Sequence, residues 1–167
     1  MSQSLNPALE DARFCPRCGA AAEVSFPRSI HCRACGYRAF FNPKPVACAI
    51  PRAADGSLWL LRRAFDPGAG LWTFPGGFVD LGESVEDAAH REVREELEID
   101  IELRGLVGVY SREDDRIVLI VFDAVALGEG RTTEEATEVR KFAPHEVPWS
   151  ELAFWSTERA LRDLLGG

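Results

Sequence analysis

Three glutamates at helical spacing constrain the fold of this chain more than any other feature. Glu92, Glu95 and Glu96 occupy positions i, i+3 and i+4, which places three carboxylates on one helix surface within about two turns. Ser84 is predicted to be the N-cap of this helix, and Asp87 completes a variant of the capping box. Because the carboxylates repel one another, we expect a cation among them, and divalent metal ions that prefer oxygen ligands suit this role.

An apolar stripe at about 100° per residue marks the buried face of the same helix. Glu92 and Glu96 lie at the edge of this stripe, where the pattern predicts apolar side chains. A solvated acidic helix face is the alternative interpretation. Arg91 and the upstream turn Pro75-Gly76-Gly77 favour the metal site, since two glycines let the backbone approach a ligand closely. The stripe consists of Val85, Ala88, Ala89, Val93 and Leu97.

The glutamates belong to a longer pattern with fixed spacing. Gly77 is followed after five residues by Glu83, and after seven more by the run Arg91-Glu92-Val93-Arg94-Glu95-Glu96, with Ile99 in the last aliphatic position. This pattern resembles the Nudix box, the signature of the Nudix hydrolases. Glu98 stands where the family usually has glycine, so the helix must continue or end with a strained φ, at a cost of about 1 kcal/mol.

The resemblance implies an α/β fold, an α/β/α sandwich with a mixed sheet, and hydrolysis of a nucleoside diphosphate linked to another group. Metal ions neutralise the phosphate oxygens and lower the pKa of a bound water, and a carboxylate can then accept its proton. By resemblance, Arg91 orients the carboxylates and Glu83 braces the junction of loop and helix. The implied ligands of Mg²⁺ or Mn²⁺ are Glu92, Glu95, Glu96 and a carbonyl of Gly76 or Gly77.

Two C-x2-C knuckles near the start of the chain predict a second metal site. Thirteen residues separate them, and glycine follows each knuckle. Four thiolates at this spacing suit tetrahedral Zn²⁺ with no open position, which makes the zinc structural. Two redox or disulfide pairs are the alternative. The predicted ligands are Cys15, Cys18, Cys32 and Cys35, whereas Cys48 is expected to pack in a strand.

The predicted organisation is an N-terminal tail at 1–12, a zinc ribbon at 13–42 and a Nudix hydrolase domain at 43–167. The ribbon has too small a core to fold unaided, so metal must supply much of its stability. The sequence shows no secretory signal and no apolar run of about 18 residues. We therefore expect a cytoplasmic protein without a membrane partner, and a reducing compartment also suits free thiols.

Charge is divided unevenly along the chain. Residues 12–44 carry a net charge of +5 and residues 45–167 a net charge of −11, within a total of −8. Basic residues beside aromatic ones could bind nucleic acid or a nucleotide. We favour the other interpretation, that the aromatics fill a small core and the arginines are solvated, and the acidic body argues against general binding of nucleic acid. The aromatics are Phe14, Phe26, Tyr37, Phe40 and Phe41.

Alternating and continuous apolar runs predict the remaining elements. Strands are expected at 46–50, 58–62, 101–110, 116–127 and 139–142, with a short extended piece at 71–74 and a polar loop at 129–138. Residues 156–165 are predicted to form a helix, with Ser156 as its N-cap.

The combination of a ribbon with the sequences FFNPKPVACAI, LWTFPGGFVDLGES and LAFWSTERAL resembles the zinc-ribbon Nudix subfamily that includes ADP-ribose and FAD pyrophosphatases. This favours ADP-ribose, or a dinucleotide such as FAD or NAD(H), with release of AMP. The chain lacks the Ser-Gln-Pro-Trp-Pro-Phe-Pro tract of NADH pyrophosphatases, so NADH is less favoured. A sanitising pyrophosphohydrolase of nucleoside triphosphates and a non-catalytic nucleotide sensor or binding module remain the alternatives.

Contacts with the nucleotide substrate are only loosely indicated. Arg62 or Arg63 could meet a phosphate, although a surface arginine pair is an equal alternative. Trp72 or Phe74 could stack on a base, but core packing explains each of them better. Glu135, with Glu134 and Glu138, lies on the late loop where many Nudix enzymes place an extra carboxylate, which a solvated loop acid would also explain. By family analogy, the chain is expected to be able to form a homodimer.

Overall fold

The computed structural model describes residues 4–166, which divide into two compact units. The first contains residues 4–44 together with 112–117, and the second contains residues 45–111 and 118–166. Each unit is described by itself.

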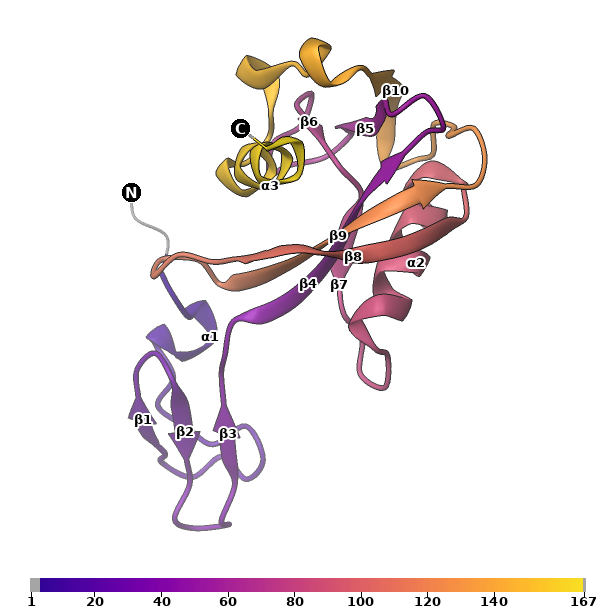
Figure 1. Ribbon diagram of the computed structural model, residues 1–167. Helices are drawn as coiled ribbons and strands as arrows, with labels where there is room; N and C mark the ends of the chain where they lie inside the picture. Colours follow the sequence, from indigo (N-terminus) through magenta and orange to yellow (C-terminus); the bar gives the residue numbers. More distant parts are fainter. Residues whose placement is uncertain (1–3, 167) are drawn as a thin grey trace. The chain divides into compact units, whose positions relative to one another are not determined.

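The first unit is built around a small antiparallel sheet (Figure 1). Its strands are β1 (Glu23–Ser25), β2 (Ser29–His31) and β3 (Arg38–Phe40), in the order β1-β2-β3. The short helix α1 (Pro7–Glu10) precedes them, and the preceding Asn6 side chain donates a hydrogen bond of 2.7 Å to the carbonyl of Pro27. With three residues in each strand, this sheet is too small to bury much apolar surface.

A larger sheet forms the centre of the second unit, with five strands in the order β10-β5-β4-β9-β8. The short strands β6 and β7 pair with β5 and β4, respectively. The order of elements along the chain is β4 (Lys44–Arg52), β5 (Leu58–Arg63), β6 (Trp72–Thr73), β7 (Gly76–Phe78), α2 (Val85–Leu97), β8 (Ile101–Tyr110), β9 (Ile117–Ala126), β10 (Ala136–Phe142), the 3₁₀ helices η1 (Pro144–Glu146) and η2 (Trp149–Glu151), and α3 (Trp155–Leu165).

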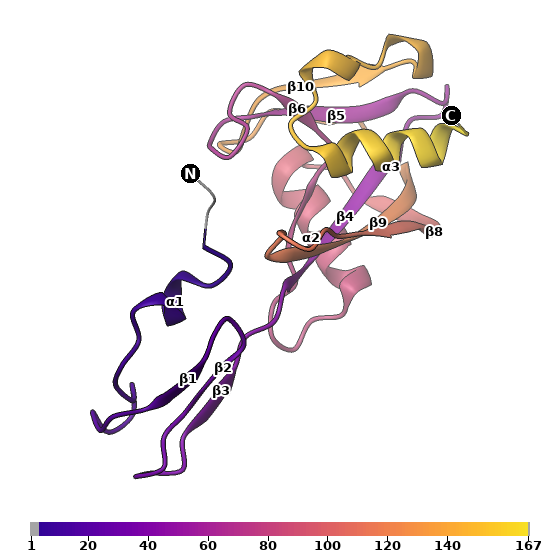
Figure 2. The same ribbon diagram turned by 90° about the vertical axis from the view of Figure 1, so that its left-hand side faces the viewer.

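Helices α2 and α3 cover opposite faces of this sheet (Figures 1 and 2). The apolar stripe of α2 packs on one face, where Val93 and Leu97 join Trp59 and Leu61 of β5 in one buried cluster. On the other side, the Tyr110 hydroxyl at the end of β8 donates a hydrogen bond of 3.0 Å to Asp163 of α3. The predicted α/β/α sandwich with a mixed sheet is confirmed.

Local sequence signals explain both ends of α2. The Ser84 hydroxyl accepts a hydrogen bond of 3.0 Å from the backbone N–H of Asp87, as predicted for the N-cap. At the other end, Glu98 is the C-cap with φ 55° and ψ 32°, and its N–H donates to the carbonyl of Arg94. Of the two possibilities for Glu98, the helix therefore takes the second: it ends there in the left-handed region.

Two predicted boundaries are wrong. Strand β10 begins at Ala136 instead of 139, because Ala136 is buried opposite Arg63 while polar residues occupy its exposed positions. Helix α3 begins at Trp155 with Phe154 as N-cap, so Ser156 lies inside the helix and is buried. Capping residues near a helix start are common, and burial overrides the local preference here. Within residues 4–166, no helix combines the length and apolarity that crossing a membrane requires.

Candidate metal-dependent active site

Glu96 is the buried carboxylate of the predicted site. Its position at the edge of the apolar stripe of α2 leaves it only 6% exposed. Its carboxylate accepts a hydrogen bond of 2.8 Å from the backbone N–H of Gly76. Burial raises the pKa of Glu96 to about 8; the Gly76 N–H opposes this shift, and the charges of Glu92 and Glu135 add to it. A carboxylate in such surroundings is ionised at neutral pH only if a cation compensates its charge.

Arg91 organises the remaining acids. Its guanidinium forms a two-pronged ion pair with Glu83, with N–O distances of 2.8 and 3.0 Å. The Nη1 group also donates to Glu92 at 2.7 Å and to Glu95 at 2.9 Å. Nη2 bonds the carbonyl of Phe78 at 3.0 Å, which ties the helix to the end of β7. Arg91 thus holds three carboxylates in defined positions through hydrogen bonds with charged groups.

Electrostatics separate the acids around Arg91. The hydrogen bond from Arg91 lowers the pKa of Glu83, so this carboxylate stays charged beside the guanidinium. Burial raises the pKa of Glu92, although the hydrogen bond from Arg91 opposes the shift. Glu92 and Glu96 are therefore the two site carboxylates whose charged form burial disfavours.

The glycine turn packs so closely on its surroundings that a Cβ atom at either glycine would meet other atoms. A Cβ atom on Gly77 would clash with the carboxylate of Glu92. A Cβ atom on Gly76 would clash with the Cys48 side chain and with the backbone of β4. Neither glycine has a positive φ, so close approach, and not a left-handed turn, explains both.

The donor set fits a hydrated divalent cation. Carboxylate oxygens are what Mg²⁺ and Mn²⁺ prefer, and Mg²⁺ usually keeps several waters in place of protein ligands. In the described part of the chain, only the four cysteines place three or more donor atoms within 4.8 Å of one another.

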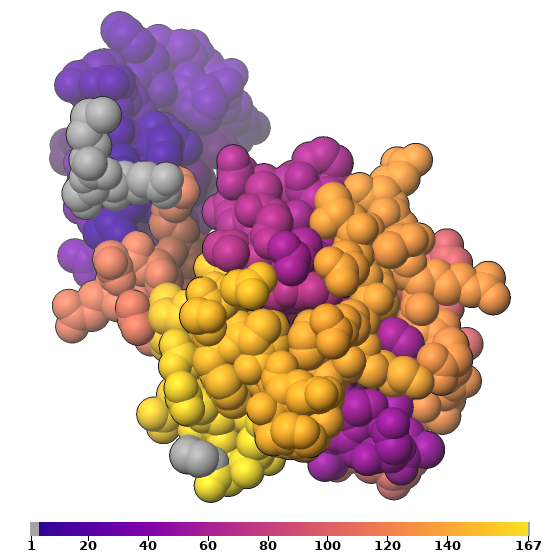
Figure 3. Space-filling model, turned by 90° about the horizontal axis from the view of Figure 1, so that it is seen from above, coloured from indigo at the N-terminus to yellow at the C-terminus, as the bar shows by residue number. Residues whose placement is uncertain are grey.

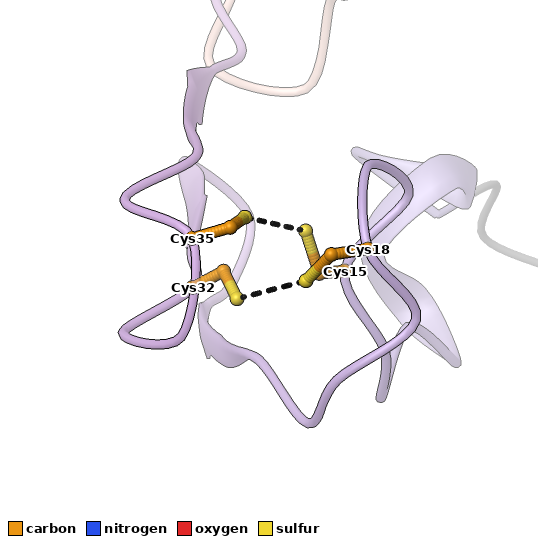
Figure 4. Close-up of side chains that lie close together, drawn as sticks. All are labelled: Cys15, Cys18, Cys32 and Cys35. Carbon is orange, nitrogen blue, oxygen red and sulfur yellow. Dashed lines mark hydrogen bonds between the residues drawn. The ribbon is translucent and has the colours of Figure 1, made fainter.

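The predicted zinc ligands meet in the first unit (Figure 4). Sγ of Cys15 lies 3.7 Å from Sγ of Cys35, and the Sγ atoms of Cys18 and Cys32 are also 3.7 Å apart. Tetrahedral coordination at a Zn–S distance of about 2.3 Å requires S–S separations of about 3.8 Å, so the thiols fit a zinc ion. All four are free cysteines, which disagrees with the alternative of two disulfide pairs.

The aromatic side chains of the ribbon do not fill a core, so that interpretation is wrong. Phe14 and Phe40 are 67% and 72% exposed, and Phe26 is exposed as well. The reason is the small size of the sheet. Among the residues of its three strands, only Ile30 is buried.

The remaining predicted substrate contacts differ in their surroundings. Trp72 and Phe74 are 2% and 3% exposed, in accord with core packing, so we propose no base stacking for them. Glu135 lies on the loop before β10, and its carbonyl accepts a hydrogen bond from the N–H of Ala64. Its charge acts on both Glu92 and Glu96, which places it beside the acidic site. Arg62 and Arg63 follow one another at the end of β5.

Comparison with known proteins decides the family. The sequence profile of the NUDIX domain matches residues 42–164. The chain belongs to the Nudix family. It is a Nudix hydrolase, as the sequence predicted.

Several relatives are similar over much of this Nudix chain. An ADP-ribose pyrophosphatase from Methanocaldococcus jannaschii is 33% identical over 135 residues, which cover 77% of each protein. The NAD-capped RNA hydrolase NudC of Haemophilus influenzae is 33% identical over 103 residues, but the match spans only 38% of that protein. The crystal structure of a Nudix hydrolase from Nitrosomonas europaea superposes with a TM-score of 0.81 at 32% identity, covering 90% of this chain and 89% of that one.

Two features of the Nudix site had no clear sequence signal. The hydrogen bond from Gly76 to Glu96 joins residues 20 positions apart, and it exists only because β7 and α2 pack together. The closeness of Cys48 to the same site follows from the pairing of Cys48 with Gly76 across β4 and β7. Long-range pairing of this kind is not encoded in local periodicity.

Proposed function

We propose that this Nudix hydrolase cleaves the diphosphate bond of ADP-ribose, or of a related dinucleotide such as FAD or NAD(H), and releases AMP. The buried Glu96 carboxylate, which needs a cation to be charged, is the observation that carries the proposed chemistry. The choice of substrate rests on the relative named ADP-ribose pyrophosphatase, which aligns over most of both chains.

In this proposal Glu92, Glu95 and Glu96 hold Mg²⁺ or Mn²⁺, with a carbonyl of Gly76 or Gly77 as a further ligand. When bound, the metal neutralises phosphate charge and lowers the pKa of a water. Arg91 keeps Glu92 and Glu95 in place, and Glu83 fixes Arg91 in turn. Such outer partners of metal ligands commonly contribute about 10- to 100-fold to affinity or activity.

Glu135 is our candidate for the base that accepts the proton of the attacking water. It is exposed, it is not held by Arg91, and its charge acts on both Glu92 and Glu96. A general base must be able to reach the attacking water. We also propose that the ribbon holds a structural Zn²⁺ and that the protein acts in the cytoplasm on a small nucleotide.

The test is a substrate panel with product identification. Purified enzyme with Mg²⁺ is incubated with ADP-ribose, FAD, NADH and the nucleoside triphosphates, and the products are separated by chromatography. AMP and ribose 5-phosphate from ADP-ribose support the proposal, and Glu96→Gln should abolish them. Release of pyrophosphate from triphosphates alone would select the sanitising activity. Binding of ADP-ribose without turnover in Mg²⁺ or Mn²⁺ would select a sensor.

A further inference from the structure

The two adjacent arginines at the end of β5 face different surroundings. Side chains alternate between the faces of a strand, so Arg63 lies on the same face as Trp59 and Leu61. Those two residues pack in the cluster that contains Val93 and Leu97 of α2. Arg62 belongs to the opposite face, with Leu58 and Leu60. The face of Arg63 is therefore the face that carries the acidic helix.

Arg62 is engaged by the protein through hydrogen bonds, ion pairs and a ring contact. Its Nη1 donates to the carbonyl of Gly70 at 3.2 Å, and its Nη2 lies 3.3 Å from the carboxylate of Glu151. Its Nε lies 3.3 Å from Glu138, its direct neighbour across β5 and β10. The guanidinium also covers the ring of Trp72, 4.8 Å from its centroid. These contacts connect Arg62 to β10, to the loop at Gly70 and to η2.

Arg63 is held in place but keeps its terminal groups free. Its Nε donates to the carbonyl of Pro67 at 2.7 Å, and its guanidinium carbon lies 5.4 Å from the ring centroid of Phe154. A Cβ atom at Gly68 would lie 3.6 Å from each of these two side chains, so the loop after β5 passes close to both. Within residues 4–166, neither terminal amino group of Arg63 has a hydrogen-bond acceptor or a carboxylate within ion-pair distance.

The free end of Arg63 belongs to the acidic site. Its positive charge lowers the pKa of Glu96, against the larger effect of burial, which requires the two groups to lie near each other. Arg63 is also paired with Ala136 across β5 and β10, directly after Glu135. Figure 3 shows the loop after β5 in purple to magenta, bordered by the orange chain around β10 and the yellow-orange chain that leads to α3.

We propose that Arg63 binds the phosphate oxygens of the diphosphate substrate and that Arg62 has a structural role. A planar guanidinium with both terminal amino groups unoccupied matches two phosphate oxygens, and holding it in advance reduces the entropy lost on binding. Phe154 and the Pro67 carbonyl supply that preorganisation. The inference rests on the proposed function, because it assumes that the phosphates bind beside Glu96.

Binding of ADP-ribose is the direct test, measured by calorimetry with Mg²⁺ in the inactive Glu96→Gln background. Removal of Arg63 should weaken Kd by about 10- to 100-fold, the loss expected for hydrogen bonds with charged groups. Arg63→Lys keeps the positive charge but lacks the planar guanidinium. Its Kd should therefore lie between that of the Arg63 protein and that of Arg63→Ala. Arg140→Ala is the matched control, because Arg140 also covers an aromatic ring, that of Phe142, away from the acids.

Kinetics provide a second measurement in the otherwise unchanged enzyme. Arg63→Ala should raise KM more than it lowers kcat, since phosphate contacts exist before the transition state. Arg62→Ala should instead lower the thermal midpoint by more than Arg63→Ala does. An unchanged Kd for ADP-ribose in Arg63→Ala would overturn the inference. An unchanged Kd in Arg63→Lys would show that binding needs the positive charge but not the planar guanidinium.

Failure of the proposed function is recognised separately. If wild-type enzyme ignores ADP-ribose, the same variants are measured with whichever diphosphate or triphosphate compound the panel shows to be bound. If none is bound, both proposals fail. If one is bound equally by wild type and Arg63→Ala, only the assignment of Arg63 fails.

Discussion

Replacing Glu98 with glycine should stabilise the Nudix domain. Glu98 ends α2 with φ 55° and ψ 32°, and it is exposed. Residues other than glycine pay about 1 kcal/mol or more in this region. The carboxylate also lies at the negative end of the helix dipole, which costs about 0.3 kcal/mol or more. Glycine also makes the unfolded chain more flexible. This lowers the free energy of unfolding by about 0.4–1 kcal/mol and opposes the two gains.

The net gain expected for Glu98→Gly is about 0.5 kcal/mol. Its side chain has no hydrogen bond or ion pair within residues 4–166 that the substitution would remove. For a domain of this size, that corresponds to a rise in thermal midpoint of about 1–3 °C. Calorimetry at neutral pH with zinc retained measures it on the transition of the Nudix domain. Turnover should be unchanged, since Glu98 is an exposed C-cap residue beyond the helical residues that carry the site acids.

Two further variants separate strain from charge. Glu98→Gln removes the unfavourable charge but keeps the positive φ, so it should recover only about 0.3 kcal/mol. Glu98→Ala should behave like Glu98→Gln, because any Cβ atom is strained at this φ. If glycine, glutamine and alanine raised the midpoint equally, backbone strain would not be the cause and the argument would be refuted.

Three other predictions concern the metals and their supports. Because burial raises the pKa of Glu96 from 4.5 to about 8, the metal-free protein should lose stability as pH rises between these values. Mg²⁺ should therefore raise the thermal midpoint more at pH 8 than at pH 6, and Glu96→Gln should abolish that difference. Arg91→Ala should lower kcat/KM by about 10- to 100-fold, measured with the substrate of the panel, while Arg91→Lys should restore little because it cannot form the paired contact with Glu83. Elemental analysis should find about one zinc per chain. Removal of zinc by a chelator should speed hydrogen exchange in residues 13–42 while the second unit stays protected. Unchanged exchange in residues 13–42 would contradict a structural zinc.

Much of the site could be predicted from sequence because its residues are close along one helix. Spacing alone put Glu92 and Glu96 on the edge of a buried stripe, and Ser84 marked the start of α2 through a local hydrogen bond. The four cysteines were equally predictable, since knuckle spacing limits where thiols can meet. Local geometry determines these features, so periodicity and spacing can report them.

The errors have a common physical origin in burial. Ser156 resembles an N-cap, yet it is buried inside α3, and the start of β10 was hidden by polar residues on its exposed face. The ribbon aromatics were assigned to a core, but a sheet with three-residue strands cannot enclose them. Each of these outcomes depends on what packs above the segment, which neighbouring residues in sequence do not specify.

The arginine pair shows where sequence reasoning could have gone further. Trp59 and Leu61 alternate with Leu58 and Leu60 along β5, so Arg62 and Arg63 must leave the strand on opposite faces. Only one of those faces can carry the acidic helix, and under our proposal a diphosphate bound there would meet Arg63 and not Arg62. Which face that is follows from the packing of Leu61 against Val93 and Leu97, a contact between elements about thirty residues apart. Strand periodicity therefore separates the two roles, and tertiary packing assigns them.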